Sequence, residues 1–437
     1  MKTIANIPDK GDKKRVVIVG GGFAGLEFSK KLNPKFFQIV LVDKINYYQF
    51  QPLLYQVATA GLEPSSISYP HRKAFQQHPD FHFRRCKALQ TTENFLETTI
   101  GTISYDYLVV ATGCSTNFFG DESLREKTFA LKTVSEALLM RNRILLSFEE
   151  ALCACDEETV RPKLTFVIVG GGATGIELAG ALADMQRSIL PKDYPELDFS
   201  KMEIHLIDAS PRLLTAMSEE ASAEVAKTLR NRGVIIHHNK AVKSYVDSVI
   251  EISDGTKIVS GNVFWAAGLK ANSLAGFPET AYFKGRLLVD EYNRVAGCDN
   301  VFCLGDTALM KTAEYPNGHP QVAQPAIQMA RNLAKNLNKS AASKGSATNK
   351  FKKFSYKDKG TMATIGRNAA VASIGKLKFK GRIAWWIWLL IHILFIVGNK
   401  NKVTVFVNWA WSYFNYDVSL RLLILPKFSK IYQEKFC

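Results

Sequence analysis

The sequence lacks a long uninterrupted apolar run. The longest lies at 383–397, IAWWIWLLIHILFIV, and its 15 residues are all apolar except His392. As a helix this run would measure about 22 Å, which is short of the ~30 Å hydrocarbon core of a bilayer. We therefore expect no membrane-spanning helix. Residues 1–15 also contain no apolar stretch, so we expect no secretory signal peptide.

Cysteine is scarce as well, with seven residues scattered over 437. An odd, scattered set argues against a disulfide framework and favours a reducing compartment. The one close pair, Cys153 and Cys155, has no partners at zinc-site spacing, and the eight histidines form no HExxH or paired-ligand pattern. We expect no metal site.

Acidic residues are rare in one region only. Residues 341–437 hold 17 Lys and Arg against 3 Asp and Glu, whereas residues 1–340 hold 39 against 37. The net charge of +16 therefore belongs almost entirely to the C-terminal part. With 47% hydrophobic and 22% charged residues, the chain as a whole has the composition of a folded protein.

The strongest local pattern is RVVIVGGGFAGLEFSKKL at 15–32, in which an apolar strand leads through three glycines into a helix. In this motif Gly20 allows a tight turn, Gly22 lets the backbone approach a pyrophosphate, and Gly25 lets the helix pack closely on the strand. A second apolar strand ends at Asp43, whose carboxylate can accept hydrogen bonds from a ribose diol. The set predicts a dinucleotide site.

The same pattern recurs about 150 residues later, with Gly170, Gly172 and Gly175 followed by a strand that ends at Asp208. The 38 residues between Gly170 and Asp208 exceed the usual spacing, and we assign the surplus at 184–201 to an extended helix end and a loop. A carboxylate at this position repels a 2′-phosphate, so we expect NADH rather than NADPH. An enzyme with two such sites usually passes a hydride from nicotinamide to flavin.

Further motifs resemble the two-dinucleotide-binding flavoprotein reductases, a resemblance that covers about 15–340. It implies an NADH domain inserted within an FAD domain. It also implies three ligand-binding segments, of which the first and third lie near FAD and the second lies near NADH. These segments are YLVVATG with Ala111, Thr112 and Gly113, VFWAAG with Ala267 and Gly268, and VFCLGD, whose Asp306 would reach the ribityl chain of FAD.

Within this group, the sequence most resembles one family, the type II NADH dehydrogenases. These enzymes are NADH:quinone oxidoreductases that do not pump protons. The stretch FQPLLYQVA at 50–58 lacks the CxxxxC of dithiol enzymes, and AQPAIQ at 323–328 resembles the AQxAxQ quinone motif. Gln324 and Gln328 are four residues apart and share one helix face. The resemblance implies that both bind quinone and that Glu177 lies near flavin and quinone, where it would relay protons. A carboxylate near a helix N-terminus also has a purely structural explanation.

The C-terminal part of the sequence predicts a segment that binds the surface of a membrane. After a polar linker at 339–350, residues 360–376 predict two short strands joined by Arg367-Asn368, followed by Lys376, Lys378, Lys380 and Arg382 and the apolar run. Two apolar, aromatic, cation-flanked segments provide the two-signal anchoring that monotopic proteins need. A buried dimerisation helix and a hairpin through the bilayer are the alternatives, and the pattern argues against nucleic-acid binding.

The sequence thus predicts an α/β protein with two Rossmann-like domains and a C-terminal membrane-associating helical segment. The expected domains are FAD-binding at 13–125 and 276–340, NADH-binding at 126–275, and membrane-anchoring at 351–437. We expect FAD as bound cofactor, NADH and quinone as substrates, the lipid surface as partner, and a place on the cytoplasmic face of the cell membrane; the resemblance adds a homodimer. A soluble ferredoxin- or rubredoxin-type reductase and a membrane-tethered NADH sensor are the rival functions.

Overall fold

The computed structural model describes residues 3–4, 6–343, 351–415 and 420–424. Parts of the predicted linker at 339–350 and of the last apolar segment at 421–430 lie outside these residues. The chain forms two compact units: the first comprises 1–48, 69–115 and 269–358, and the second comprises 49–68, 116–268 and 359–437. The predicted domains were instead defined by the ligand that each is expected to bind. That assignment of FAD, NADH and membrane to parts of the chain stays a prediction.

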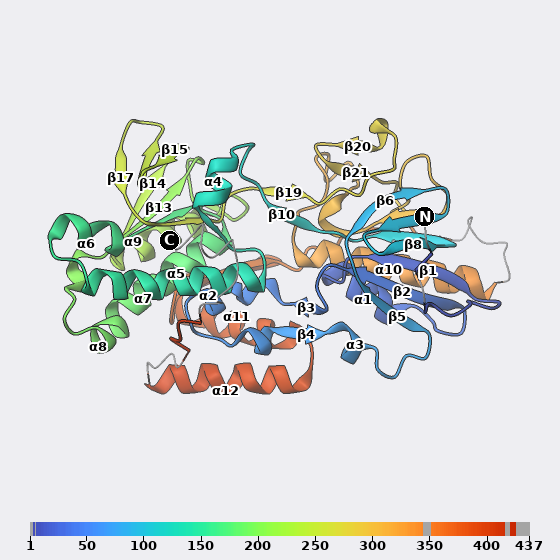
Figure 1. Cartoon of the computed structure of the whole chain (residues 1–437), viewed down its shortest axis with the longest axis horizontal. Helices are drawn as coiled ribbons and strands as arrows, with labels where there is room; N and C mark the ends of the chain where they lie inside the picture. The colour runs from blue at the N-terminus through green and yellow to red at the C-terminus, as the bar shows by residue number, and fades with distance from the viewer. Residues whose placement is uncertain (1–2, 5, 344–350, 416–419, 425–437) are drawn as a thin grey trace. The chain divides into compact units, whose positions relative to one another are not determined.

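The first unit is built on a five-stranded parallel sheet (Figure 1). Its central strands are buried on both faces and read as continuous apolar runs, as parallel strands do. Helices α1 (Phe23–Lys31) and α10 (Ala323–Ala342) pack against each other in this unit. In spatial order the strands are β22 (Val301–Cys303), β9 (Tyr107–Val110), β1 (Lys14–Val19), β2 (Phe37–Asp43) and β5 (Phe81–Arg85).

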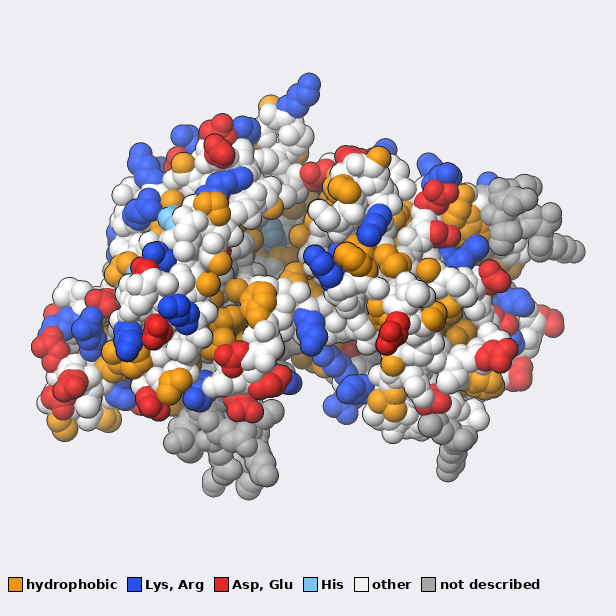
Figure 2. All heavy atoms as spheres, turned by 90° about the horizontal axis from the view of Figure 1, so that it is seen from above, with side chains coloured by type: hydrophobic (Ala, Val, Ile, Leu, Met, Phe, Trp, Pro, Cys, Tyr) orange, Lys and Arg blue, Asp and Glu red, His pale blue; other side chains and the backbone are white. Residues whose placement is uncertain are grey.

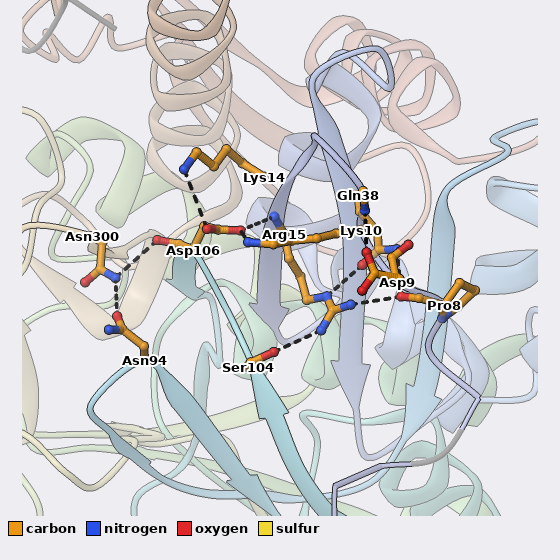
Figure 3. Close-up of polar contacts among 11 residues, drawn as sticks. Pro8, Asp9, Lys10, Lys14, Arg15, Gln38, Asn94, Ser104, Asp106 and Asn300 are labelled. Atoms are coloured by element: carbon orange, nitrogen blue, oxygen red, sulfur yellow. Dashed lines mark hydrogen bonds and ion pairs between the residues drawn. The ribbon is translucent and has the colours of Figure 1, made fainter.

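A polar network around Asp106 joins the start of this sheet (Figure 3). The Asp106 carboxylate accepts from the backbone N–H of Arg15 at 2.6 Å and from Lys10 Nζ at 2.5 Å. The Arg15 guanidinium donates to Ser104 Oγ at 3.0 Å and to Gln38 Oε1 at 2.6 Å. Burial raises the pKa of Asp106, but the hydrogen bonds from Lys10 and Arg15 outweigh it and hold the pKa below its ordinary value. The ionised carboxylate thus fixes the register of the first strands.

The second unit repeats the architecture with another five-stranded parallel sheet. After β12 (Thr165–Val169), helix α7 (Ala173–Ser188) continues into the short helix α8 (Leu190–Asp193) and the 3₁₀ turn η3 (Phe199–Lys201). Strand β13 (Glu203–Asp208) follows. The predicted extended helix end and loop before Asp208 are therefore confirmed. The strands in spatial order are β11 (Phe129–Ala130), β18 (Asn262–Trp265), β12 (Thr165–Val169), β13 (Glu203–Asp208) and β14 (Val234–His238).

Smaller elements complete the two units. In the first, two small sheets comprise β6 (Ala88–Thr92), β7 (Phe95–Thr98), β8 (Gly101–Ser104) and β20 (Tyr282–Phe283), β21 (Arg286–Leu288), β23 (Ala308–Leu309). In the second, the sheet β15 (Val242–Val246), β16 (Val249–Ile252), β17 (Lys257–Val259) accompanies helices α2 (Leu54–Ala58), α4 (Glu122–Lys127), α5 (Val134–Leu152), α6 (Glu157–Leu164) and α9 (Glu219–Asn231). The remaining elements are β3 (Tyr47–Gln49), β4 (Ser68–Pro70), α3 (His71–Ala74), β10 (Cys114–Thr116), β19 (Leu269–Ala271) and the 3₁₀ turns η1 (Gln51–Leu53), η2 (Pro64–Ile67), η4 (Glu279–Ala281) and η5 (Gly305–Thr307).

The C-terminal part of the second unit forms a small sheet and two helices. The predicted strand pair around Arg367-Asn368 is present as β24 (Thr361–Thr364) and β25 (Ala370–Ile374). A third strand, β26 (Leu377–Lys380), occupies the basic segment before the apolar run. The run itself is helix α11 (Gly381–Phe395), and α12 (Asn399–Asn415) follows and contacts it (Figure 1). Among the described residues, no helix has both the length and the hydropathy to cross a membrane.

Charge is distributed as the sequence indicates. On the face drawn in Figure 2, acidic and basic side chains are intermixed, in keeping with the near-balance of 39 basic and 37 acidic residues in 1–340. In the second unit, Lys378 and Lys380 of β26 lie 3.1 Å from Glu220 and 3.5 Å from Glu224 of α9. These exposed pairs contribute little stability, and they leave Lys376 and Arg382 exposed beside α11.

Candidate functional site

The first glycine loop follows β1 in the first unit. Gly20 has φ +102°, and a Cβ there would lie 2.3 Å from Ala111 O, while a Cβ on Gly25 would lie 1.8 Å from Gly20 O. Both positions therefore exclude every larger residue. A Cβ on Gly22 would meet no atom within 4 Å, so the space above this backbone is open. Open space at the start of α1, whose first turn holds no acidic side chain, suits a pyrophosphate.

Asp43 closes this loop from the end of β2. Its carboxylate accepts the backbone N–H of Gly21 at 2.5 Å and that of Ile45 at 3.0 Å, which orients it and leaves lone pairs for a ribose diol. A third residue at this loop, His71, is fully buried and was not indicated by any sequence pattern. A Cβ on Gly21 would lie 2.3 Å from the His71 ring, so this imidazole packs directly on the loop.

Two other segments that the motifs predicted, residues 111–114 and 306–307, contact each other in the same unit. Thr112 Oγ1 lies 3.0 Å from Thr307 Oγ1, and Thr307 donates to Gly113 O at 2.9 Å. Asp306 accepts from the Cys114 thiol at 2.8 Å. Ala111, next to Thr112, is the residue that approaches Gly20. The residues predicted to hold FAD thus all belong to the first unit, and their chemistry fits FAD.

The second glycine loop follows β12 in the second unit and repeats this geometry. Gly170 has φ +115°, with a Cβ position 2.8 Å from Ala266 and Ala267, and a Cβ on Gly175 would lie 1.9 Å from Gly170 O. Gly172, like Gly22, has open space above it.

Two more of the residues predicted for NADH belong to the same unit as this second loop. Asp208 accepts the backbone N–H groups of Gly171 and Ser210, the latter at 2.6 Å. Gly268, at φ +73°, lies against Phe119. This loop and its carboxylate fit the adenosine half of NADH.

Gln324 and Gln328 lie in the first turns of α10 and are both partly exposed. Gln328 Nε2 donates to Lys357 O at 2.9 Å, and Gln328 Oε1 accepts from Lys357 N at 3.0 Å. The same Nε2 lies 3.4 Å from Gln324 Oε1. The two amides therefore do share one face, as predicted, but the Gln328 amide is already engaged by backbone, which leaves the Gln324 amide group as the better placed of the two to meet a ligand.

Glu177 lies in the second turn of α7 in the second unit, and its side chain is buried, with only 6% of the residue exposed. Its Oε1 accepts the backbone N–H of Thr364 at 3.4 Å, and the indole of Trp388 lies nearby. Burial raises the pKa of Glu177 to about 8, against the weaker lowering effects of Thr364 and Trp388. A carboxyl that is protonated at neutral pH is poised to donate a proton.

The candidate residues therefore fall into two groups. The FAD residues and the glutamine pair belong to the first unit, and the NADH residues and Glu177 belong to the second. The six cysteines in the described part of the chain are free thiols, with Cys153 and Cys155 exposed at the end of α5.

Comparisons with known proteins agree over most of the chain. Residues 14–330 match the family described as pyridine nucleotide-disulphide oxidoreductase, and residues 359–415 match the NDH2 C-terminal domain. The chain is 34% identical to the type II NADH:quinone oxidoreductase Ndh of Mycobacterium tuberculosis, over 91% of this chain and 88% of that one. It is 30% identical to the type II NADH:quinone oxidoreductase of Haemophilus influenzae, over 83% and 87%.

The fold is also known from solved structures. The structure of NDH2 from Plasmodium falciparum in complex with NADH superposes with a TM-score of 0.86 at 20% identity, covering 94% of this chain and 100% of that one. The expected fold, with two dinucleotide-binding domains and a C-terminal helical segment, is confirmed. The chain belongs to the pyridine nucleotide-disulphide oxidoreductase family and, within it, to the type II NADH dehydrogenases.

Proposed function

We propose that the protein is an FAD-dependent NADH:quinone oxidoreductase that passes two electrons to a membrane quinone without pumping protons. The observation that carries this proposal is the pair of glycine loops, each closed by its own aspartate, on two separate parallel sheets. Two such sites serve two dinucleotides. Residues 44–62, which follow Asp43, contain no cysteine that could take the electrons instead.

The work of the first unit is to hold FAD. The backbone at Gly22 and the start of α1 would face the pyrophosphate, Asp43 the adenosine ribose, and Asp306 the ribityl chain. When bound, FAD supplies the redox chemistry by accepting a hydride from NADH and passing two electrons to quinone. The chain itself supplies orientation and proton transfer.

NADH would bind at the second glycine loop with its ribose on Asp208. We expect an Asp208→Asn variant to keep the hydrogen bond from Gly171 but to lose the charge that repels a 2′-phosphate. The ratio kcat/KM for NADH over NADPH should fall by at least about tenfold, which corresponds to roughly 1.4 kcal/mol of discrimination. Steady-state kinetics with both nucleotides checks this. A wild-type preference for NADPH, or an unchanged ratio in the variant, would overturn the assignment.

Quinone would meet the amide of Gln324, with Gln328 holding that face of α10 in place through Lys357. A Gln324→Ala variant should raise the quinone KM about fivefold, because one lost hydrogen bond costs on the order of 1 kcal/mol. Reduction of the flavin by NADH in stopped flow should not change. Asn332→Ala is the matched control. Asn332 lies one turn after Gln328 on α10, and its amide donates to Lys352 O as the Gln328 amide donates to Lys357 O. Equal quinone kinetics in the two variants would remove Gln324 from the site.

The C-terminal helices would hold the enzyme on the lipid surface, at the cytoplasmic face of the cell membrane. One face of each helix is apolar and exposed. Lys376 precedes α11, Arg382 lies in its first turn, and Lys400 lies in the first turn of α12. Two such segments suffice for stable monotopic attachment. The homodimer expected from the family resemblance is part of this proposal and is tested by sedimentation in detergent.

The rival function of a soluble ferredoxin- or rubredoxin-type reductase is not favoured, because residues 359–415 match the NDH2 C-terminal domain and the relatives are named quinone oxidoreductases. A membrane-tethered NADH sensor is not favoured for the same reason. Steady-state NADH oxidation separates all three. Fast turnover with a short-chain quinone supports the proposal, turnover only with an iron–sulfur protein supports the reductase, and turnover with neither supports the sensor.

A further inference from the structure

At the second glycine loop, the order of the strands fixes the direction in which NADH would lie. Strands β12, β13 and β14 are parallel neighbours in that order, and β14 is the edge of the sheet (Figure 1). The pyrophosphate would lie at Gly172, after β12, and the ribose at Asp208, which ends β13. In the same direction, the next element that the nucleotide meets is the end of β14.

His238 is the last residue of β14 and pairs in register with Asp208. Register partners on neighbouring strands lie about 4.8 Å apart, and their side chains point to the same face of the sheet. Beyond the strands, the two segments stay together. Lys240 N donates to Asp208 O at 3.0 Å, and Asn239 N donates to Ser210 O at 3.1 Å. The His238 imidazole is thereby placed beside the carboxylate that would hold the ribose diol.

The two adjacent histidines of β14 have different surroundings. His237 points to the opposite face of the sheet, where its Nε2 lies 3.1 Å from His205 Nδ1 and the two rings stack. His238 is half-buried, and its Nδ1 has no hydrogen-bond partner among the described residues. No acceptor at Nδ1 therefore fixes the His238 ring in its protonated form.

The charged groups around His238 favour its neutral form at pH 7. Burial and the Arg230 guanidinium of α9 lower the pKa of His238 below its ordinary value, against the raising effect of Asp208. Lys240, which follows the strand, is paired with Asp254 at 2.9 Å. A phosphate on the ribose 2′ oxygen would add about two negative charges beside this ring. The protonated ring would therefore favour a nucleotide that carries this phosphate.

We propose that His238 determines how strictly the second glycine loop discriminates between NADH and NADPH. While the imidazole is neutral, the Asp208 carboxylate repels a 2′-phosphate. When the imidazole is protonated, its positive charge beside Asp208 offsets that repulsion, and NADPH is accepted. The binding of NADPH is thus coupled to the uptake of a proton by His238. This inference rests on the proposed binding of NADH at Asp208.

The first test is a His238→Arg variant of the full-length holoenzyme, which places a permanent positive charge beside Asp208. We expect the ratio of kcat/KM for NADPH over NADH to rise at least about fivefold at pH 8, where wild-type His238 is neutral. Ile235→Arg is the matched control, because Ile235 is exposed on the opposite face of the same strand. This control adds the same charge and should change the ratio by less than about twofold. Equal ratios in the two variants would overturn the proposal.

The second test is the pH dependence of the same ratio. A 2′-phosphate itself takes up a proton near pH 6, so some rise towards acid pH belongs to the nucleotide. The wild-type ratio should rise more steeply from pH 8 to pH 5.5 than the ratio of His238→Asn. Calorimetry measures the same difference without catalysis. At pH 5.5, His238→Asn should lose at least about threefold of the preference for adenosine 2′,5′-bisphosphate over AMP. Identical profiles and affinities in the two proteins would contradict the role of His238.

The Asp208→Asn variant separates this inference from the NADH site itself. If Asp208→Asn changes the nucleotide ratio and the His238 variants do not, the site stands and the role of His238 fails. If Asp208→Asn also leaves the ratio unchanged, the proposed NADH site fails, and the inference fails with it.

Discussion

Replacing Trp386, Leu390 and Leu394 by glutamate should release the protein from lipid vesicles. These three side chains are 54%, 61% and 61% exposed and follow one face of α11, whereas Ala384 and Trp388 on the opposite face are buried. Each large apolar side chain contributes roughly 1–2 kcal/mol on transfer out of water. Losing three should weaken partitioning by at least about 100-fold. Co-sedimentation with anionic vesicles measures this.

The control for this experiment is a second triple variant, with Leu152, Ile235 and Val246 replaced by glutamate. These residues are also exposed, at 40%, 41% and 52%, but lie outside the C-terminal helices. It has the same change of charge and should bind vesicles better than the α11 variant by more than tenfold. NADH oxidation with ferricyanide should persist in both. If both triple variants bind alike, the loss reflects charge rather than a membrane-facing helix.

Point substitutions are preferable here to removal of the whole C-terminal part. Strand β26 pairs with β25, and the buried face of α11 contacts β24 and β25, so a truncation at 376 would expose the core of the small sheet. Helix α12 is also fixed, because Asn401 donates to Ser68 O at 2.8 Å. Strand β26 and helices α11 and α12 therefore help to hold the second unit together, in addition to carrying the proposed membrane-binding surface.

Replacing Glu177 by glutamine should lower quinone turnover at pH 7 by about 10- to 100-fold, in the range of a lost general acid. Because burial raises the pKa of Glu177 to about 8, the wild-type rate should fall as pH rises through that value. The variant should show no such fall. Flavin reduction by NADH should proceed equally in both. A wild-type pH profile in the variant would leave Glu177 only a structural role.

The same pKa makes a prediction about stability. An unfolded glutamate titrates near 4.3, whereas folded Glu177 titrates at about 8, so the folded state holds the proton more tightly. The stabilisation from this group is complete below the unfolded pKa and is lost as pH rises through about 8, on the order of a few kcal/mol. Thermal unfolding from pH 6 to 9 should therefore show a smaller loss of Tm in Glu177→Gln. Glu219→Gln, on an exposed helix start, should follow the wild type.

Much of the candidate site could be predicted because its chemistry is local in sequence. Gly25 and Gly175 must be glycines because the backbone oxygen of Gly20 or Gly170 lies five residues earlier and less than 2 Å from where a Cβ would be. The aspartates were identified by the strand ends they occupy, even where Asp208 stands at unusual spacing. Each strand, its glycine turn and the aspartate at the end of the next strand lie within a few dozen residues of one another. The pattern of residue types in that short stretch is therefore enough to predict the site.

The features of the site that could not be predicted from the sequence depend on contacts between segments that lie far apart along the chain. His71 packs on Gly21 from 50 residues away, and no motif announces it. Gln328 matches a quinone motif, but its amide is held by Lys357, 29 residues further on. Trp409 donates to Gln56, which lies 353 residues earlier, and the Tyr55 hydroxyl meets that of Thr364, 309 residues further on.

The sequence by itself determined that two dinucleotide loops, a basic C-terminal part and an apolar run too short to span a bilayer occur in one chain, because each is a matter of residue type and local spacing. Only the tertiary structure decided which face of that run is exposed, which glutamine amide is already engaged, and that Glu177 is buried. Burial and hydrogen-bond direction arise when segments far apart in the sequence exclude water from one another, and no local pattern records that.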